Sequence, residues 1–439
     1  MKLSELIHSR QAKIGIIGLG YVGLPLALNF GRKGFKALGL DVDKTKVDAV
    51  NAGRSYIEHI PSAEISEMKN KGLLEATTDM SRAKDADAII ICVPTPLTHH
   101  LDPDLAYVIS TIEAILPHLR ENQLVSLEST TYPGTTDEEL RPRIEKRGFK
   151  IGENFHLVFS PEREDPGNEQ FPSHKIPKIV GGTTPACLEQ GRALYGAAFE
   201  TVVPVGSTQV AEFAKLLENI YRSVNIGLVN EMKIVADKMG VDIWEVIHAA
   251  STKPFGFKAF YPGPGLGGHC IPIDPFYLTW KAKEYGIHTR FIELAGEIND
   301  HMPDYVIRRT MEVLNLRKKK AMNGSRVLVL GLAYKANVDD MRESPSFKLL
   351  DQLKLHGADA HYYDPHIPVV PPTREHKEWT GHKSVAWDEK TLRSYDAVII
   401  STGHRAYNLD QLVEWCDCII DTRNTLAGRN TKPGQVTKA

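Results

Sequence analysis

One apolar run that ends in closely spaced glycines, Lys13-Ile-Gly-Ile-Ile-Gly-Leu-Gly-Tyr-Val-Gly23, constrains the fold of this chain more than any other feature. The run predicts a short strand and a tight turn, and Leu24 to Phe30 predicts a helix. A second strand, Phe35-Lys-Ala-Leu-Gly-Leu, ends in Asp41. This order of elements predicts a parallel βαβ unit of an α/β fold.

The same turn predicts a binding site for a dinucleotide. Gly18, Gly20 and Gly23 permit the tight turn, the close approach of a pyrophosphate and close packing of the helix on its strand. Asp41 follows Gly18 by roughly 20 residues, the spacing of the acid that binds the adenosine ribose. Since no arginine follows Asp41 immediately, NAD is favoured over NADP.

The strand-and-glycine opening recurs in Ser325-Arg-Val-Leu-Val-Leu-Gly331, and Asp364 mirrors Asp41. We therefore predict two Rossmann-like, doubly wound parallel-sheet domains joined by a long central helix. The second copy carries the polar loop Tyr334–Ser344 in place of the full glycine pattern. It is interpreted either as a site for a nucleotide sugar or mononucleotide, or as a structural copy without a ligand.

The stretch between the two copies predicts one long helix. Gln209 to Met239 contains no proline, Ser207 or Thr208 can cap it, and Gly240 ends it. At 1.5 Å per residue it would be about 45 Å long, as in a helix that bridges domains or forms a dimer seam. The predicted domains are residues 1–206 for NAD, 207–310 as a central helical domain, and 311–439 for a nucleotide sugar.

Two groups of residues in the central region suggest chemistry. Lys215 and Asn219 lie four residues apart, so they project from one helix face, as a reactive pair or as a solvated polar stripe. Glycines at 263, 265, 267 and 268 lead to Cys270, with Asp274 four residues later. Such a loop suits a reachable thiol nucleophile, although an inert buried cysteine beside a turn would fit it too.

Composition excludes several classes of function. The net charge is −2 without a block of like charges, so neither nucleic acid nor an anionic membrane is an expected partner. The N-terminal residues do not resemble a signal peptide and no run is long enough to span a membrane, which makes the cytoplasm the expected compartment. Cys416 and Cys418 are too close together for the usual zinc pair, so no metal is predicted.

A thiol beside a nicotinamide suits oxidation beyond an aldehyde. The thiolate adds to the carbonyl, and the thiohemiacetal that forms can lose hydride to become a thioester. Water then releases a carboxylate, and Asp274 or Glu162 can serve as the general base. A lysine lowers the pKa of the thiol, and both the lysine and an asparagine amide can stabilise the oxyanion.

Several motifs, in order, resemble the UDP-glucose/GDP-mannose dehydrogenase family over essentially the whole chain. They are Gly18–Pro25, Val93-Pro-Thr-Pro96, Ser129-Thr130, Glu212-Phe-Ala-Lys215 with Asn219, Pro262–Cys270 and Met341-Arg-Glu-Ser344. Within it, the chain looks most like the UDP-N-acetylglucosamine 6-dehydrogenases of bacterial O-antigen pathways. That likeness rests on Glu128–Thr136, Pro161–Asn168 and Lys253-Pro-Phe-Gly-Phe.

The resemblance implies a role for each matching residue. The implied catalytic residues are Cys270 as nucleophile, with Lys215, Asn219, Asp274, Thr130 and Glu162. The implied NAD contacts are Gly18, Gly20, Tyr21, Val22, Gly23, Asp41, Lys46, Thr95 and Thr130. The implied contacts to the UDP-sugar are Glu162, Arg163, Lys215, Asn219, Tyr261, Gly263, Gly267, Tyr334, Lys335 and Arg423. A homodimer or higher homo-oligomer is also expected.

The chain departs from the UDP-glucose branch at one position. Pro166 stands where that branch has a second glutamate, four residues after Glu162, which argues against UDP-glucose as the substrate. UDP-N-acetylmannosamine and UDP-glucose remain the alternative substrates. A β-hydroxyacid dehydrogenase would need neither the cysteine loop nor a second nucleotide domain, and a non-catalytic sensor would not need to keep Cys270, Lys215 and Asp274.

Overall fold

The computed structural model describes residues 2–57, 60–98, 100–163, 173–268, 270–373 and 376–439, without the side chains of Ser173 and Cys270. The chain forms two compact units, each described by itself. The first contains residues 1–218 and 276–288, and the second contains residues 219–275 and 289–439. The division therefore falls within two helices, α8 (Thr208–Met239) and α10 (Cys270–Glu284).

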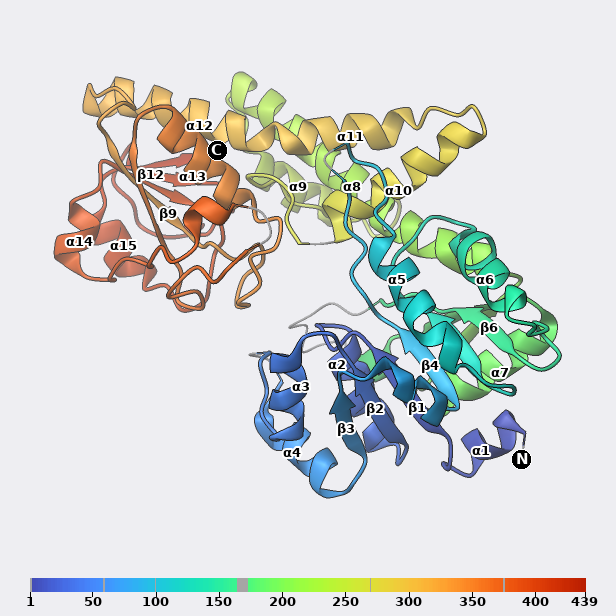
Figure 1. Cartoon of the computed structure of the whole chain (residues 1–439). Coiled ribbons are helices and arrows are strands. Elements are labelled where there is room, and N and C mark those ends of the chain that lie inside the picture. Colours follow the sequence, from blue (N-terminus) through green and yellow to red (C-terminus); the bar gives the residue numbers. More distant parts are fainter. Residues whose placement is uncertain (1, 58–59, 99, 164–172, 269, 374–375) are drawn as a thin grey trace. The chain divides into compact units, whose positions relative to one another are not determined.

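The first unit is built on an eight-stranded sheet with the order β3-β2-β1-β4-β5-β6-β7-β8 (Figure 1). Its strands are β1 (Lys13–Ile17), β2 (Lys36–Leu40), β3 (Leu74–Thr77), β4 (Ala88–Ile91), β5 (Leu124–Leu127), β6 (His156–Phe159), β7 (Lys178–Gly182) and β8 (Val202–Val205). From β3 to β6 every pair is parallel. Parallel strands end at one edge of the sheet, which is where ligands bind in folds of this class.

Helices cover both faces of this sheet. Successive side chains of a strand point to opposite faces, so Ile16 packs in one buried cluster and Ile17 in another. The helices of this unit are α1 (Leu3–His8), α2 (Gly23–Arg32), α3 (Lys44–Asn51), α4 (Ser62–Asn70), α5 (Ala106–Ile115), α6 (Arg141–Lys146) and α7 (Pro185–Gly196), with parts of α8 and α10.

The last two strands differ from the predicted all-parallel sheet. β7 runs antiparallel to β6, with Val158 opposite Gly182 and Phe159 opposite Gly181, and β8 is parallel to β7. A parallel neighbour needs a crossover connection, usually a helix. The described part of the connection between β6 and β7 contains only the helical turn Ser173–Lys175. The reversal brings the first residue of β7 to the edge where β5 and β6 end.

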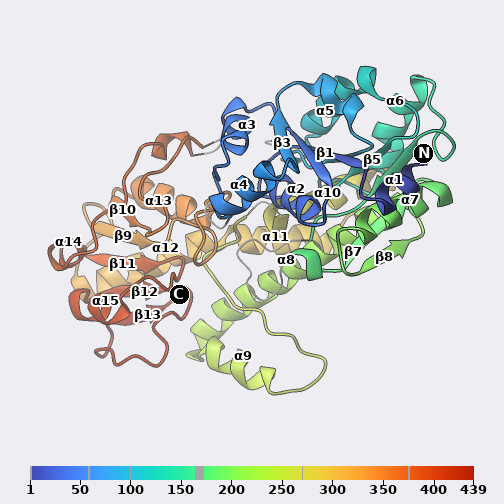
Figure 2. The same ribbon diagram turned by 90° about the horizontal axis from the view of Figure 1, so that it is seen from below.

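The second unit contains a five-stranded parallel sheet with the order β10-β9-β11-β12-β13 (Figure 2). Its strands are β9 (Arg326–Leu330), β10 (Asp359–Tyr363), β11 (Ala397–Ile400), β12 (Ile419–Asp421) and β13 (Val436–Lys438). Val329 packs in the cluster that includes Phe347 of α13 (Pro345–Leu355), whereas Leu330 packs in the cluster that includes Leu412 of α15 (Leu409–Trp415). Both faces of this sheet are therefore covered as well.

The helices of the second unit include the remainder of the long central helix. They are part of α8, α9 (Ile243–Ser251), the first turns of α10, α11 (Arg290–Asp300), α12 (Met302–Val313), α13 (Pro345–Leu355), α14 (Glu389–Arg393) and α15 (Leu409–Trp415). The predicted fold class, with parallel α/β sheets in two domains and a long central helix, is confirmed. The boundaries at residues 206 and 310 stay a prediction.

The turn after β9 contains a glycine, Gly331, that a residue with a side chain should not be able to replace. Gly331 has a φ of +89°, and a Cβ there would lie 2.5 Å from Cβ of Thr402. Gly324 has a φ of +77° with no atom within 4 Å of the added Cβ. We expect Gly331→Ala to destabilise the protein by about 1–3 kcal/mol more than Gly324→Ala, because only Gly331 adds a clash to the backbone strain. Calorimetric unfolding of both variants measures the difference, and equal shifts would contradict the prediction.

Candidate functional site

The turn between β1 and α2 forms a cradle of bare backbone. Gly18 has a φ of +91°, and a Cβ there would lie 2.8 Å from the carbonyl oxygen of Cys92. A Cβ on Gly23 would lie 1.8 Å from the carbonyl oxygen of Gly18, so helix and turn pack too closely for a side chain. Gly20, in contrast, faces open space. Tyr21 and Val22 complete the turn before α2, whose N-terminus attracts phosphate.

Asp41 closes this cradle from the end of β2. Its buried carboxylate accepts hydrogen bonds from the backbone N–H of Leu19 at 2.7 Å and of Asp43 at 2.9 Å. Lys46 of α3 lies 3.6 Å from the same carboxylate. The residues therefore fit a dinucleotide, with bare backbone for the pyrophosphate and a fixed acid for the ribose.

The next two strands bring Thr95 and Thr130 to the same edge of the sheet. Thr95 follows β4 and is buried, and Thr130 follows β5 and is half-buried. The hydroxyl of Ser129 donates to the carbonyl oxygen of Val93 at 2.7 Å, which joins the two loops. The predicted NAD contacts from the ends of β1, β2, β4 and β5 thus belong to one strand edge.

Glu162 and Arg163, beyond β6, contact the part of α8 that lies in the first unit. The ammonium group of Lys215 donates to the backbone carbonyl of Glu162 at 2.6 Å. Arg163 forms an ion pair with Glu218 at 2.7 Å. The structure therefore brings together three of the residues predicted by resemblance, Glu162, Arg163 and Lys215. Pro166 lies outside the described residues.

One residue at this edge, Lys178, was missed from the sequence. Lys178, the first residue of β7, donates to Glu128 at 2.8 Å and to Glu162 at 3.0 Å. The one available signal was a lysine directly before the apolar strand Ile179-Val-Gly-Gly182, where a buried charge needs a partner.

In the second unit, α10 begins at Cys270, whose side chain lies outside the described residues. Asp274 follows on the same helix, and its buried carboxylate accepts a hydrogen bond from the amide of Asn219. Arg222 donates to the amide oxygen of Asn219. Two predicted catalytic residues, Asn219 and Asp274, are thereby held together.

The glycine loop before α10 lies against the turns of the C-terminal sheet. A Cβ on Gly263 would lie 2.3 Å from Nη1 of Arg423, and one on Gly267 would lie 2.6 Å from Cβ of Tyr334. The backbone N–H of Gly268 donates to the carbonyl oxygen of Arg342 at 2.9 Å. Glycine is thus required at 267, where the loop meets Cβ of Tyr334, whereas a side chain at 263 would displace the end of the Arg423 side chain.

Arg423 is a partly buried cation at the end of β12. Its Nε donates to the carbonyl oxygen of Ser401 at 3.0 Å. Burial lowers the pKa of Arg423 to about 10, and Asp421 opposes this effect only in part. Within the described ranges, no carboxylate lies at ion-pair distance from its guanidinium group. An anionic ligand such as a diphosphate would supply the missing charge.

Tyr261 and Lys335 are also predicted to contact the UDP-sugar. Tyr261 is half-exposed and stacks on Trp244 of α9, with ring centroids 5.6 Å apart. Lys335 follows Tyr334 and is partly exposed. Nothing in the described contacts brings Tyr261 or Lys335 to Arg423, so their roles stay predictions.

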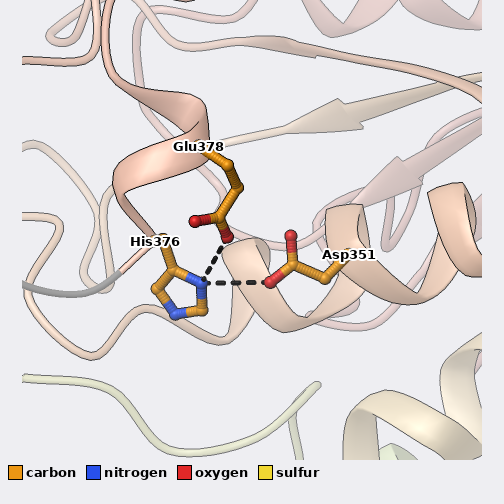
Figure 3. A group of neighbouring side chains, drawn as sticks. All are labelled: Asp351, His376 and Glu378. Carbon is orange, nitrogen blue, oxygen red and sulfur yellow. Dashed lines mark hydrogen bonds and ion pairs between the residues drawn. The ribbon is translucent and has the colours of Figure 1, made fainter.

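One group of possible metal ligands occurs in the second unit, at Asp351, His376 and Glu378 (Figure 3). Nδ1 of His376 lies 3.0 Å from Asp351 and 3.6 Å from Glu378. The other carboxylate oxygen of Asp351 accepts from the indole of Trp379 at 2.6 Å. A proton on Nδ1 satisfies these contacts, so the group is a hydrogen-bonded link between α13 and the segment that contains His376.

Comparison with known proteins identifies three consecutive family regions. Residues 12–199 match the NAD binding domain, 209–301 the central domain and 328–428 the UDP binding domain of the UDP-glucose/GDP-mannose dehydrogenase family. Among the described residues, no helix is both long and apolar enough to cross a membrane.

Relatives match along nearly the whole chain. The UDP-N-acetyl-D-glucosamine 6-dehydrogenase of Pseudomonas aeruginosa is 33% identical, covering 91% of this chain and 92% of that protein. A UDP-N-acetyl-D-mannosamine dehydrogenase of Methanococcus maripaludis is 32% identical over 94% and 93%. The solved structure of a UDP-D-ManNAc dehydrogenase from Pyrococcus horikoshii has a TM-score of 0.83 at 30% identity, covering 95% of this chain and 96% of that one.

Asp41 should determine the choice between NAD and NADP. We expect Asp41→Ala to reduce the preference for NAD, measured as the ratio of the two kcat/KM values, by about ten-fold or more. The physical reason is that a buried carboxylate repels the 2′-phosphate of NADP. Asp364→Ala is the matched control, because Asp364 makes the equivalent backbone hydrogen bond in the other sheet. Equal use of both cofactors by the unmodified enzyme would contradict the assignment.

Proposed function

Because this chain belongs to the UDP-glucose/GDP-mannose dehydrogenase family, we propose that it oxidises C6 of UDP-N-acetylglucosamine to a carboxylate. It is an NAD-dependent UDP-sugar dehydrogenase with a UDP binding domain. The observation that carries the substrate class is Arg423, a partly buried cation placed against the backbone of Gly263 in the loop that leads to Cys270. A sugar joined to a diphosphate has the anionic part that such a residue needs.

The proposed reaction proceeds through two oxidations on one sugar. Bound NAD supplies the hydride acceptor for each of them. The first converts the C6 hydroxyl to an aldehyde, and a base takes the hydroxyl proton. The thiolate of Cys270 adds to the aldehyde, the resulting thiohemiacetal loses hydride to give a thioester, and water releases the carboxylate. One sugar, two NAD and one water thus give one uronate and two NADH.

The remaining residues have proposed roles in charge and proton control. Lys215 and Asn219 stabilise the oxyanion through an ammonium and an amide group. Asp274 accepts from Asn219, which fixes the direction of that amide. Thr130 and Glu162 handle the proton and the hydrolytic water. These roles derive from the family resemblance together with the contacts within each unit.

Stoichiometry tests the covalent scheme. We expect two NADH and one carboxylate per sugar, because the aldehyde is retained as a thiohemiacetal. Cys270→Ser should abolish complete turnover, since a serine hydroxyl ionises far less readily than a thiol and its ester hydrolyses more slowly. Cys418→Ser, a change at a buried cysteine of the C-terminal sheet, is the control. A normal yield of one NADH with free aldehyde as the product would overturn the scheme.

We propose UDP-N-acetylglucosamine rather than UDP-glucose as the substrate because of the branch motifs around Glu128, Glu162 and Lys253. Pro166, which stands where the UDP-glucose branch has a second glutamate, supports the same choice. Relatives named for UDP-N-acetyl-D-glucosamine and for UDP-N-acetyl-D-mannosamine are almost equally similar to this chain. The motifs favour the gluco sugar as the substrate. Its uronate would serve surface-polysaccharide assembly, including O-antigen.

Substrate competition tests this choice. We expect kcat/KM for UDP-N-acetylglucosamine to exceed that for UDP-glucose by roughly ten- to hundred-fold. The polar atoms of the site that hydrogen-bond the acetamido group would lose their partners when UDP-glucose binds, because glucose has no such group. NADH formation on a panel of UDP-glucose and the N-acetylated gluco, galacto and manno sugars measures it. Comparable efficiency on UDP-glucose, or activity confined to the manno sugar, would contradict it.

We also propose a homodimer in the cytoplasm. An apolar stripe in the second unit, consisting of Leu228, Met232, Val235 and Met239, is exposed along one side of α8. Its spacing of three and four residues suits packing against an equivalent helix. The described cysteines, Cys92, Cys187, Cys416 and Cys418, are free thiols, which suits a reducing compartment.

A further inference from the structure

A lysine shared by two glutamates is buried at the strand edge of the first unit. The side chain of Lys178 is 3% exposed, that of Glu128 is 0% exposed, and that of Glu162 is 18% exposed. The ammonium group donates to Glu128 Oε2 at 2.8 Å and to Glu162 Oε2 at 3.0 Å. It also lies over the rings of Tyr195 and Phe199, at 5.4 Å and 5.3 Å from their centroids. One buried cation therefore serves two carboxylates.

The reversed strand creates this arrangement. Glu128 follows β5 and Glu162 follows β6, two parallel strands that end at the same edge. β7 is antiparallel to β6, so its first residue, Lys178, lies at that edge as well. In an all-parallel sheet, the same residue would begin at the opposite edge.

The two carboxylate oxygens of Glu162 accept hydrogen bonds from different groups. Its Oε1 accepts from the backbone N–H of Arg163 at 2.7 Å, and its Oε2 accepts from Lys178. The ammonium of Lys215, a predicted catalytic residue, donates to its backbone carbonyl. The direction of the carboxylate and its distance from the catalytic lysine are thus set together.

The shared cation couples the charges of the two acids. Burial alone would raise the pKa of Glu162, but attraction to Lys178 and Lys215 outweighs it and lowers that pKa. Burial raises the pKa of Glu128 to about 7, with Lys178 opposing the shift and Glu162 adding to it. Whenever Glu128 takes up a proton, the full charge of Lys178 acts on Glu162.

The other groups around Glu128 do not form a proton route to solvent. Tyr195 donates its hydroxyl proton to Glu128 Oε1 at 2.6 Å, and Ser126 lies 2.7 Å from that hydroxyl. Both residues are fully buried, so the described chain of hydrogen bonds ends inside the sheet. Cys92 also faces this group, and burial followed by repulsion from Glu128 raises the pKa of its thiol, which favours the neutral form.

We propose that Lys178 and Glu128 are positioning residues that set the direction and proton affinity of Glu162 in the reaction. This inference rests on the proposed function, because it assigns Glu162 the handling of a proton and water. Lys178 keeps Glu162 ionised and pointed inward from the loop, and Glu128 moderates the influence of that cation. A purely structural ion pair would hold the strands together without tuning Glu162.

Two substitutions should change the pH profile of kcat in different pH ranges. Lys178→Met removes the cation, so Glu162 binds its proton more tightly and the acidic limb moves to higher pH. We expect kcat at pH 7 to fall by about ten- to hundred-fold, within the range that general base catalysis contributes, with a smaller change in KM. Lys178→Arg should restore most of the activity. Glu128→Gln should remove the change in kcat near pH 7 and leave the acidic limb in place, because Glu128, with a pKa of about 7, is already protonated where Glu162 titrates.

A matched control separates this effect from lost stability. Lys281 is 6% exposed and bridges Glu138 and Glu284, also in the first unit, at 2.8 Å and 2.7 Å. Lys281→Met should lower the melting temperature while leaving the pH profile of kcat unchanged. The inference is overturned if the folded Lys178→Met enzyme keeps the normal acidic limb, or if Glu128→Gln leaves the profile of kcat near pH 7 unchanged.

A titration without substrate distinguishes this inference from the proposed function. Isotope-edited infrared spectra of ¹³C-labelled glutamate follow protonation of the carboxyl groups. We expect Glu128→Gln to remove a group that titrates near neutral pH, and Lys178→Met to shift the titration of another upward. An unmodified enzyme that oxidises no UDP-sugar would overturn the proposed function, while unchanged infrared titrations in both variants would overturn the coupling of charges.

Discussion

In each of the two sheets, a buried aspartate at the end of the second strand holds the glycine turn that follows the first strand. Asp41 accepts from the backbone N–H of Leu19, and Asp364 accepts from that of Leu332, each at 2.7 Å. A backbone donor in a buried turn needs such a partner, because an unpaired one costs about 1–3 kcal/mol. The bond fixes the turn close to the strand ends, and the positions of the other loops at that edge depend on it.

The two copies of this turn differ in what occupies the space around the aspartate. Asp41 has Lys46 at its side and the open backbone of Gly20 nearby, so a ligand can approach. Asp364 also accepts from Ala333, and His404 lies 3.1 Å away, which uses its carboxylate within the protein. The same glycine turn, held by an aspartate in each sheet, can thus bind a dinucleotide in one sheet and be blocked by side chains in the other.

Sequence patterns predicted the parts of the structure that local geometry determines. The glycine turn and the acid at Asp41 depend on spacing within one βαβ unit, so they could be read directly. The reversal of β7 depends on how a long connection returns to the sheet, and periodicity carries no information about it. For the same reason Lys178 was missed. The contact of Gly263 with Arg423 joins distant segments, and the family resemblance suggested both residues without predicting that they meet.

The energetics of the buried lysine bear on its role. Burying ionised groups costs several kcal/mol each before pairing, and well-packed apolar residues often give equal or greater stability. Lys178 binds two acids, one more than its charge can neutralise, so the trio carries a net negative charge only when Glu128, whose pKa is raised to about 7, is ionised. Stability alone would favour a single pair or none. A second acid is useful where the proton affinity of the first must be adjusted, and Glu162 lies beside Lys215, where the proposed chemistry requires that adjustment.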